Sequence, residues 1–194
     1  MKNRKLRSNY EITDNAGVAY VVGPEADLTG ADLRGMDLSY SDLAGATLKG
    51  ADLTVADVSY CDFASANFSP SDFASVSLDW SVMIGSNFEF ADLTRVSMVE
   101  AVASEANFFY ACFEAANLSG ADLTNSDLSY AQMERADLRG AVLENAEFDN
   151  ATNFIGLTDE QWLRLGLLTT AELDTFYAVL IEKQKYRRRA FGNG

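Results

Sequence analysis

Ala26-Asp27-Leu28-Thr29-Gly30 is followed directly by Ala31-Asp32-Leu33-Arg34-Gly35, and this five-residue pattern decides the fold. Its bulky apolar position, here called the centre, recurs at every fifth residue from Leu28 to Phe148 without insertion or deletion, which gives 25 units. Leu or Phe fills 20 of these centres. A small residue stands two positions before most centres, and Asp or Asn stands between the two in 16 units.

A period of five matches neither regular secondary structure. An α-helix repeats its faces every 3.6 residues and a β-strand every 2, so neither keeps all the centres on one side. A chain that turns a corner in each unit does so, because the small residue and the centre then point inward while Asp or Asn points outward. Four corners close a square coil, in which residues 20 positions apart become stacked neighbours at about 4.8 Å. The sequence therefore predicts an all-β solenoid of about six to seven four-sided coils.

The unit, written as a small residue, Asp or Asn, Leu or Phe and two variable residues, resembles the motif of the pentapeptide-repeat family over residues 26–150. The resemblance implies a right-handed quadrilateral β-helix, commonly assembled as a two-fold dimer. Some members of that family are DNA mimics, which occupy the DNA site of type II topoisomerases and either inhibit these enzymes or protect them from drugs.

Both ends of a solenoid need caps, because an exposed coil leaves unpaired strand edges and an open core. Val18 to Val22 are typical of a short capping strand, and capping-box patterns beginning at Thr158 and Thr169 predict helices after the repeat. The expected segments are a basic N-terminal arm at 1–15, a capping strand with lead-in units at 16–25, the repeat at 26–150, and a helical C-terminal cap with a basic tail at 151–194.

The second predicted helix carries one apolar stripe at helical spacing. We expect this helix to form a homodimer with its symmetry mate, although the same stripe could instead seal the solenoid. The basic tail that follows it is interpreted as a solvated end, or as a segment that grips an acidic surface. The stripe consists of Leu173, Phe176, Tyr177, Leu180 and Ile181.

Composition excludes several classes of function for these 194 residues. The chain has 29 acidic and 15 basic side chains and a net charge of −14, which argues against direct binding to nucleic acid. It has no His, and so lacks the commonest general base and transition-metal ligand; we expect no metal and no cofactor. Two Cys favour a reducing compartment. Since no apolar run approaches the ~20 residues of a membrane span, we expect a soluble cytoplasmic protein.

The repeat carries the acidity, with 21 acidic and five basic side chains between residues 26 and 150. One predicted face presents an outward acidic residue in four successive coils. This acidic stripe supports two interpretations, a DNA mimic directed at a type II topoisomerase or a surface that only keeps the solenoids apart in solution. The acidic stripe consists of Asp32, Asp52, Asp72 and Asp92.

The most irregular part of the repeat is the stretch 75–105, in which apolar residues take several outward positions. Such a departure arises either by drift or because a partner replaces the solvent. We place the candidate docking patch, called the apolar patch below, at Trp80, Val82, Ile84, Val99 and Val102.

Aromatic residues at corners stack in the predicted columns. Tyr40, Tyr60 and Trp80 share one edge, and a second trio shares the opposite edge. These ladders either stabilise neighbouring coils or serve as anchors for a partner. The second trio is Phe90, Tyr110 and Tyr130.

The two cysteines occupy different environments in the predicted coils. Cys61 falls on an inward position and Cys112 on an outward one, more than two coils away, so we expect no disulfide between them.

Taken together, the patterns predict a non-enzymatic scaffold for protein–protein interaction, with a partner that the sequence does not identify. The Asp residues recur because the unit contains one, and outward carboxylates on a convex surface have no pocket in which catalysis could take place. The alternative function is the topoisomerase-directed DNA mimic.

Overall fold

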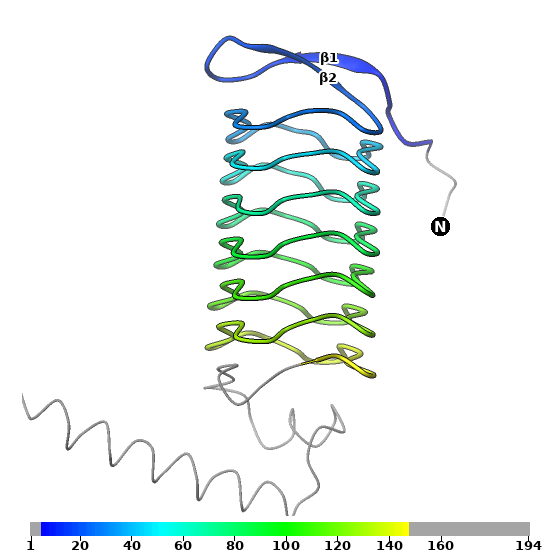
Figure 1. Ribbon diagram of the computed structural model, residues 1–194, viewed down its shortest axis with the longest axis vertical. Coiled ribbons are helices and arrows are strands. Elements are labelled where there is room, and N and C mark those ends of the chain that lie inside the picture. Colours follow the sequence, from blue (N-terminus) through cyan, green and yellow to red (C-terminus); the bar gives the residue numbers. More distant parts are fainter. Residues whose placement is uncertain (1–4, 148–194) are drawn as a thin grey trace, which may run out of the picture. The chain divides into compact units, whose positions relative to one another are not determined.

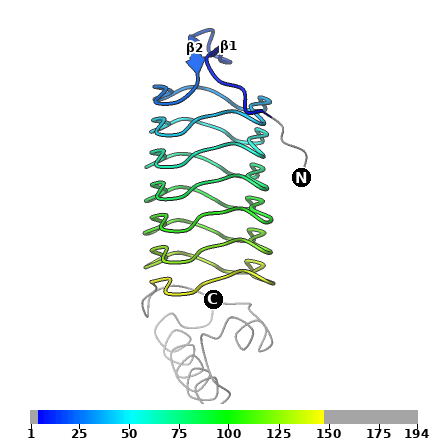
Figure 2. The ribbon, with the colours of Figure 1, turned by 90° about the vertical axis from the view of Figure 1, so that its right-hand side faces the viewer.

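The computed structural model describes residues 5–147, which belong to the first of two compact units of the chain, Met1–Leu157. The repeat forms stacked coils of 20 residues (Figures 1 and 2), because every bridge of the repeat is parallel and joins residues 20 positions apart, from Asp27 with Thr47 to Asp127 with Glu147. The predicted columns are therefore confirmed. An all-β solenoid describes this part of the chain.

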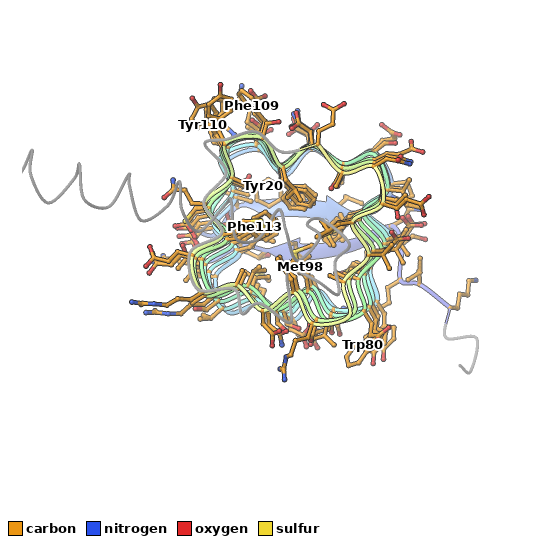
Figure 3. All side chains as sticks on the ribbon, turned by 90° about the horizontal axis from the view of Figure 1, so that it is seen from below. Tyr20, Trp80, Met98, Phe109, Tyr110 and Phe113 are labelled. Carbon is orange, nitrogen blue, oxygen red and sulfur yellow. The ribbon has the colours of Figure 1, made fainter. Side chains whose placement is uncertain are left out.

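The interior is built from the centres, as the period predicts. Seen along its axis the coil is four-sided, and the side chains of the centres fill its middle (Figure 3). Every described centre from Leu28 to Leu143 is buried, and so are most of the small residues two positions earlier. Phe68, Phe88 and Phe108 form a stacked ladder, with ring centroids 4.3 and 5.2 Å apart.

Most corners are tight turns closed by a hydrogen bond across them. In the first unit, the Ala31 amide donates to the Leu28 carbonyl at 3.1 Å. The second turn residue has a left-handed φ at every described corner from Glu25 to Asn145 except Pro70. Glycine accepts this conformation without steric cost, as at Gly30, whereas a β-branched residue such as Val55 is strained by it.

The Asp or Asn before each centre has a structural task at these corners. Its Oδ1 accepts the amide two residues later, at 2.9 Å from Asp72 to Ala74 and at 2.9 Å from Asn107 to Phe109. Because an amide oxygen serves as well as a carboxylate, the unit needs a side-chain acceptor and not a negative charge.

An antiparallel hairpin precedes the first coil. Its strands are β1 (Tyr10–Thr13) and β2 (Ala19–Val22), paired from Tyr10 with Val22 to Thr13 with Ala19. Tyr20 projects within the outline of the coils in Figure 3, and Val22 is fully buried. The hairpin therefore turns an apolar side toward the solenoid.

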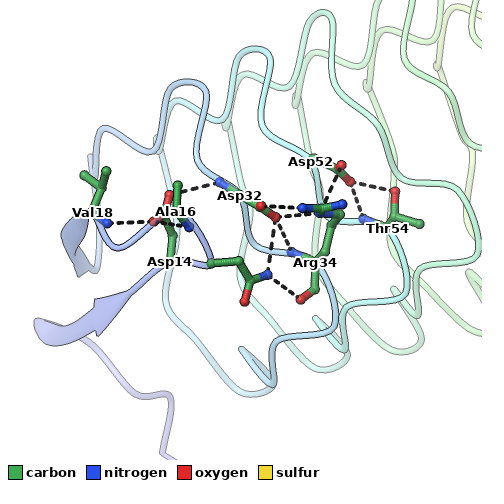
Figure 4. A network of polar contacts seen from close by, with 8 residues as sticks. Asp14, Ala16, Val18, Asp32, Arg34, Asp52 and Thr54 are labelled. Atoms are coloured by element: carbon green, nitrogen blue, oxygen red, sulfur yellow. Dashed lines mark hydrogen bonds and ion pairs between the residues drawn. The ribbon is translucent and has the colours of Figure 1, made fainter.

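The loop between β1 and β2 satisfies the edge of the first coil (Figure 4). In later coils the amide at this position donates to the coil before it, as from Asp52 to the Ala31 carbonyl at 3.0 Å. The equivalent Asp32 amide donates instead to the Asp14 carboxylate at 3.1 Å, and the Asn15 amide group donates to the Arg34 carbonyl at 2.8 Å. Asp14 and Asn15 thus replace the coil that is missing there.

A second segment covers another face of the first coil. The Arg7 amide donates to the Tyr40 carbonyl at 2.6 Å, and the Asp42 amide donates to the Arg7 carbonyl at 2.8 Å. The Arg7 guanidinium also donates to the Ser39 carbonyl at 2.7 Å. These contacts pair the residues before the hairpin with the first coil through a parallel bridge from Arg7 to Ser41, one position before the Asp42 bridge to the next coil.

The predicted C-terminal helices and the stripe at 173–181 lie outside the described residues. Across residues 5–147, no helix is long and apolar enough to cross a membrane.

Candidate functional site

The apolar patch assembles on one face and the two corners that bound it. Val82 and Val102 are bridge partners, and the same column continues to Asp62 before them and Asp122 after them. Trp80 stands at the corner just before Val82. The patch is thus a strip of apolar side chains set between acidic ones.

The other members of the apolar patch join these residues through neighbouring positions. The Trp80 amide donates to the Val99 carbonyl of the next coil at 2.9 Å. Trp80 and Ile84 each remain 40% exposed, and the three valines are half-buried. All five predicted residues therefore lie within two adjacent coils.

The valines of this patch cost the coil a local hydrogen bond. Asp62 accepts the Ala64 amide at 3.0 Å, whereas the side chains of Val82 and Val102 have no acceptor for the corresponding amides. The fold alone would accordingly favour Asp or Asn at both positions.

The first aromatic ladder borders this patch, and its predicted stacking is confirmed. The ring centroids are 4.7 Å apart between Tyr40 and Tyr60 and 5.0 Å between Tyr60 and Trp80, with nearly parallel planes. Trp80 adds a large rigid side chain to the apolar patch at a corner where its φ is 57°.

The second ladder is confirmed as well, and the structure adds a residue to it. Phe90 stacks on Tyr110 with centroids 5.5 Å apart, and Tyr110 stacks on Tyr130 at 4.7 Å. The sequence-based reasoning missed Phe109, whose ring meets Tyr110 edge-on at 4.8 Å. Its column position, between Glu89 and Ser129, was the signal that could have identified it. Figure 3 shows this cluster and Trp80 at opposite corners.

The acidic stripe also forms a column, with successive bridges from Asp32 through Asp52 and Asp72 to Asp92. Its first members are paired with a cation: an Arg34 Nη lies 2.6 Å from an Asp32 oxygen, and Nε lies 3.6 Å from Asp52 (Figure 4). The hydrogen bonds from Arg34 hold the pKa of Asp32 well below its ordinary value. The unpaired negative charge of the stripe is therefore greatest toward Asp72 and Asp92.

Both cysteines are free thiols, as predicted. Cys61 is buried beside the Leu38 carbonyl at 3.2 Å, and burial raises the pKa of its thiol to about 12. Cys112 is half-buried, with its sulfur 3.3 Å from the Thr94 hydroxyl. Within the part of the chain that the structure describes, no three Cys, Asp or Glu side chains gather closely enough to hold a metal ion.

Comparison with known proteins identifies the repeat. The family profile described as pentapeptide repeats matches in eight copies, at residues 25–54, 51–89, 61–98, 86–125 and 116–152. No curated protein matches significantly.

Among solved structures, the chain is similar to HetL, a pentapeptide repeat protein involved in heterocyst differentiation regulation from the cyanobacterium Nostoc sp. strain PCC 7120. It is 31% identical, with 64% of this chain and 71% of HetL covered and a TM-score of 0.49. Rfr23 from the cyanobacterium Cyanothece 51142 is 24% identical over 58% of this chain and 63% of its own, with a TM-score of 0.45. QnrB1, a plasmid-mediated fluoroquinolone resistance protein, is 18% identical over 72% and 83%, with a TM-score of 0.34.

Proposed function

Because this chain belongs to the pentapeptide-repeat family, we propose that it acts as a non-enzymatic scaffold which docks a partner protein on the apolar patch. The observation that carries this proposal is the bridged pair Val82 and Val102, set between Asp62 and Asp122 in one column. Two outward valines in a column of carboxylates give up corner hydrogen bonds, and a partner that covers them would offset that loss.

The solenoid suits this role because its surface is ordered before binding. Bridges connect each coil of the apolar patch to the coils before and after it, so its side chains stand on a stiff support. A preorganised surface loses little conformational entropy on association, and Trp is among the residues enriched in binding hot spots.

The test restores the repeat at the patch. In Val82→Asp/Val102→Asp both positions regain the acceptor that Asp62 provides in the same column, so the coil should fold at least as well as before. Asp62→Asn is the matched control, because it retains the acceptor and the apolar patch. Proteins captured from an extract of the source cells by immobilised wild type, identified by mass spectrometry, are then measured individually for affinity.

We expect the Kd of a genuine partner to rise at least about tenfold in the double variant and to change less than about twofold in Asp62→Asn. Equal affinity of every captured protein for wild type and the double variant would contradict the proposal.

The second candidate function is a DNA mimic that acts on a type II topoisomerase. The continuous column of the acidic stripe favours it, since four carboxylates recur there at the spacing of successive coils. Substituting Asn for Asp52, Asp72 and Asp92 keeps each corner acceptor, as Asn87 does for Glu89 at 3.0 Å. The variant therefore removes charge without removing the turns.

The assay is supercoiling by DNA gyrase with and without a quinolone. A mimic would inhibit the enzyme or protect it from the drug, and the triple variant would lose that effect, whereas Asp42→Asn/Asp62→Asn/Asp122→Asn on another face would retain it. No effect of the wild-type protein at saturating concentration would exclude this candidate.

Assembly as a homodimer through Leu173, Phe176, Tyr177, Leu180 and Ile181 belongs to the same proposal, and rests on their helical spacing. Sedimentation equilibrium of the full chain tests it. A dimer that becomes monomeric in Leu180→Asp supports the stripe as the interface, and a monomeric wild type at all accessible concentrations contradicts it.

A further inference from the structure

The corner opposite Trp80 exposes a compact group of large rings (Figure 3). Phe90 is 55% exposed, Tyr110 44% and Tyr130 38%, and Phe109 lies beside them. The Phe109 ring stands at 73–83° to its three neighbours, so rings of two orientations meet at this edge. These four residues are called the aromatic corner.

The fold does not demand aromatic residues there. Gly30 and Gly50 occupy the same column and adopt the same left-handed turn, which glycine enters without strain. Phe90, Tyr110 and Tyr130 adopt it with φ values of 57–60°, a conformation that bulky side chains disfavour. The residue before the corner is polar in neighbouring coils, Ser69 and Ser129 among them, so Phe109 is not a requirement of the repeat either.

The charged residues nearest the aromatic corner in the sequence are acidic. The stretches 87–93, 107–113 and 127–133 contain three acidic residues and no Lys or Arg, while Arg95 and Arg135 stand at the next corner of the coil. The three acidic side chains are exposed or half-buried. They are Glu89, Asp92 and Asp127.

We propose that the aromatic corner binds an arginine-bearing segment of a partner protein. A guanidinium group stacks on aromatic rings and is attracted by their negative faces, while the surrounding carboxylates complement its charge. Acidic residues at the rim would also speed the encounter with a basic segment. Phe109 and Tyr110 lie at the corner opposite Trp80, so the aromatic corner is a different surface from the one that Trp80 contributes to the proposed docking patch (Figure 3).

The experiment measures binding of a defined probe to the full chain. The probe is a fluorescein-labelled peptide of alternating Arg and Gly with six Arg, titrated at 150 mM salt and followed by anisotropy; the same peptide with Glu in place of Arg is the charge control. Phe109→Ser/Tyr110→Asn replaces two rings by residues that the repeat accepts at these positions. Ser129 occupies the position of Phe109 in the next coil, and Asn adopts the left-handed φ of the corner readily, as at Asn125.

The matched control is Tyr60→Asn, which removes a ring from the other ladder. Asp52→Asn/Asp72→Asn controls for acidity at a distance from the rings. We expect the Kd for the Arg peptide to rise at least about tenfold in Phe109→Ser/Tyr110→Asn and less than about twofold in both controls. Circular dichroism and thermal unfolding verify that each variant retains the solenoid.

Several results would overturn this inference. Absence of Arg-peptide binding to wild type would do so, as would an equal Kd for Phe109→Ser/Tyr110→Asn, since binding would then depend on net charge alone. Tight binding of the Glu peptide would remove the charge argument. Self-association of the wild type that is lost in Phe109→Ser/Tyr110→Asn would identify a second copy as the occupant instead.

Discussion

Replacing Asp14 should open the first coil of the solenoid without unfolding the rest. This buried carboxylate accepts three amides: Oδ1 those of Ala16 at 3.0 Å and Val18 at 2.8 Å, and Oδ2 that of Asp32 at 3.1 Å (Figure 4). A hydrogen bond to a charged group contributes about 1.5 kcal/mol or more. Three such bonds sum to about 4.5 kcal/mol. Water can hydrogen-bond to some of the freed amides at the edge of the fold and so offsets part of the loss, and we therefore expect Asp14→Ala to destabilise the cap by about 3 kcal/mol.

A graded series separates the three bonds. Asp14→Asn keeps an oxygen for Ala16 and Val18 and presents an NH₂ group to the Asp32 amide, so about 1 to 1.5 kcal/mol should be lost. Hydrogen exchange measures the effect directly, because in a solenoid each coil contacts only its neighbours and the end can open alone. Protection of the Asp32 amide should fall roughly a hundredfold in Asp14→Ala and about tenfold in Asp14→Asn, since each 1.4 kcal/mol corresponds to a factor of ten.

The controls test whether the loss is local and due to the acceptor. Glu11→Ala removes an exposed acidic residue of β1 and should leave protection of the Asp32 amide unchanged. The Asp92 amide, which donates to the Ser71 carbonyl at 3.1 Å, should keep its protection in every variant. Unchanged exchange at Asp32 in Asp14→Ala would refute the reasoning that Asp14 replaces a missing coil.

Three further predictions concern the interior, one ion pair and the thiols. Phe88→Ala should cost about 3 to 5 kcal/mol in the free energy of unfolding by urea, because this ring is fully buried in the Phe ladder; a loss below about 1 kcal/mol would contradict that packing. In Arg34→Gln the pKa of Asp32 should return toward about 3.9 when followed by carboxyl ¹³C NMR. Since the pKa of Asp32 is depressed in the folded protein, its contribution to stability is complete above about pH 4 and is lost as the pH falls through the folded-state pKa. Arg34→Gln should not show this loss of stability at low pH. An unchanged pKa of Asp32 in the variant would show that Arg34 does not cause the depression. At pH 8 a thiol reagent should label Cys112 rapidly in the native protein and Cys61 only after unfolding, because the reactive thiolate is scarce at a pKa of about 12; equal native rates would contradict the burial of Cys61.

The period of the sequence was sufficient to predict which residues are buried and which equivalent positions stack on one another. Counting in steps of five identified the buried centres, and counting in steps of 20 identified the stacked rings of Tyr40, Tyr60 and Trp80 and the column that joins Val82 to Val102. These contacts were accessible because the separation between partners is constant, so one frame applies along the whole repeat.

The tertiary structure alone decided how the first coil is closed and how surface charge is distributed. Asp14 accepts the amide of Asp32, which is 18 residues away in the sequence, and the Arg7 amide donates to the carbonyl of Tyr40, which is 33 residues away. No period of the sequence predicts either pairing. The Arg34 side chain turns back toward Asp32 and neutralises part of the charge of the acidic stripe. This contact depends on the rotamer of Arg34, which its position in the repeat does not specify. A periodic sequence specifies contacts between equivalent residues; contacts between the repeat and a segment that folds back on it depend on the path of the chain in space.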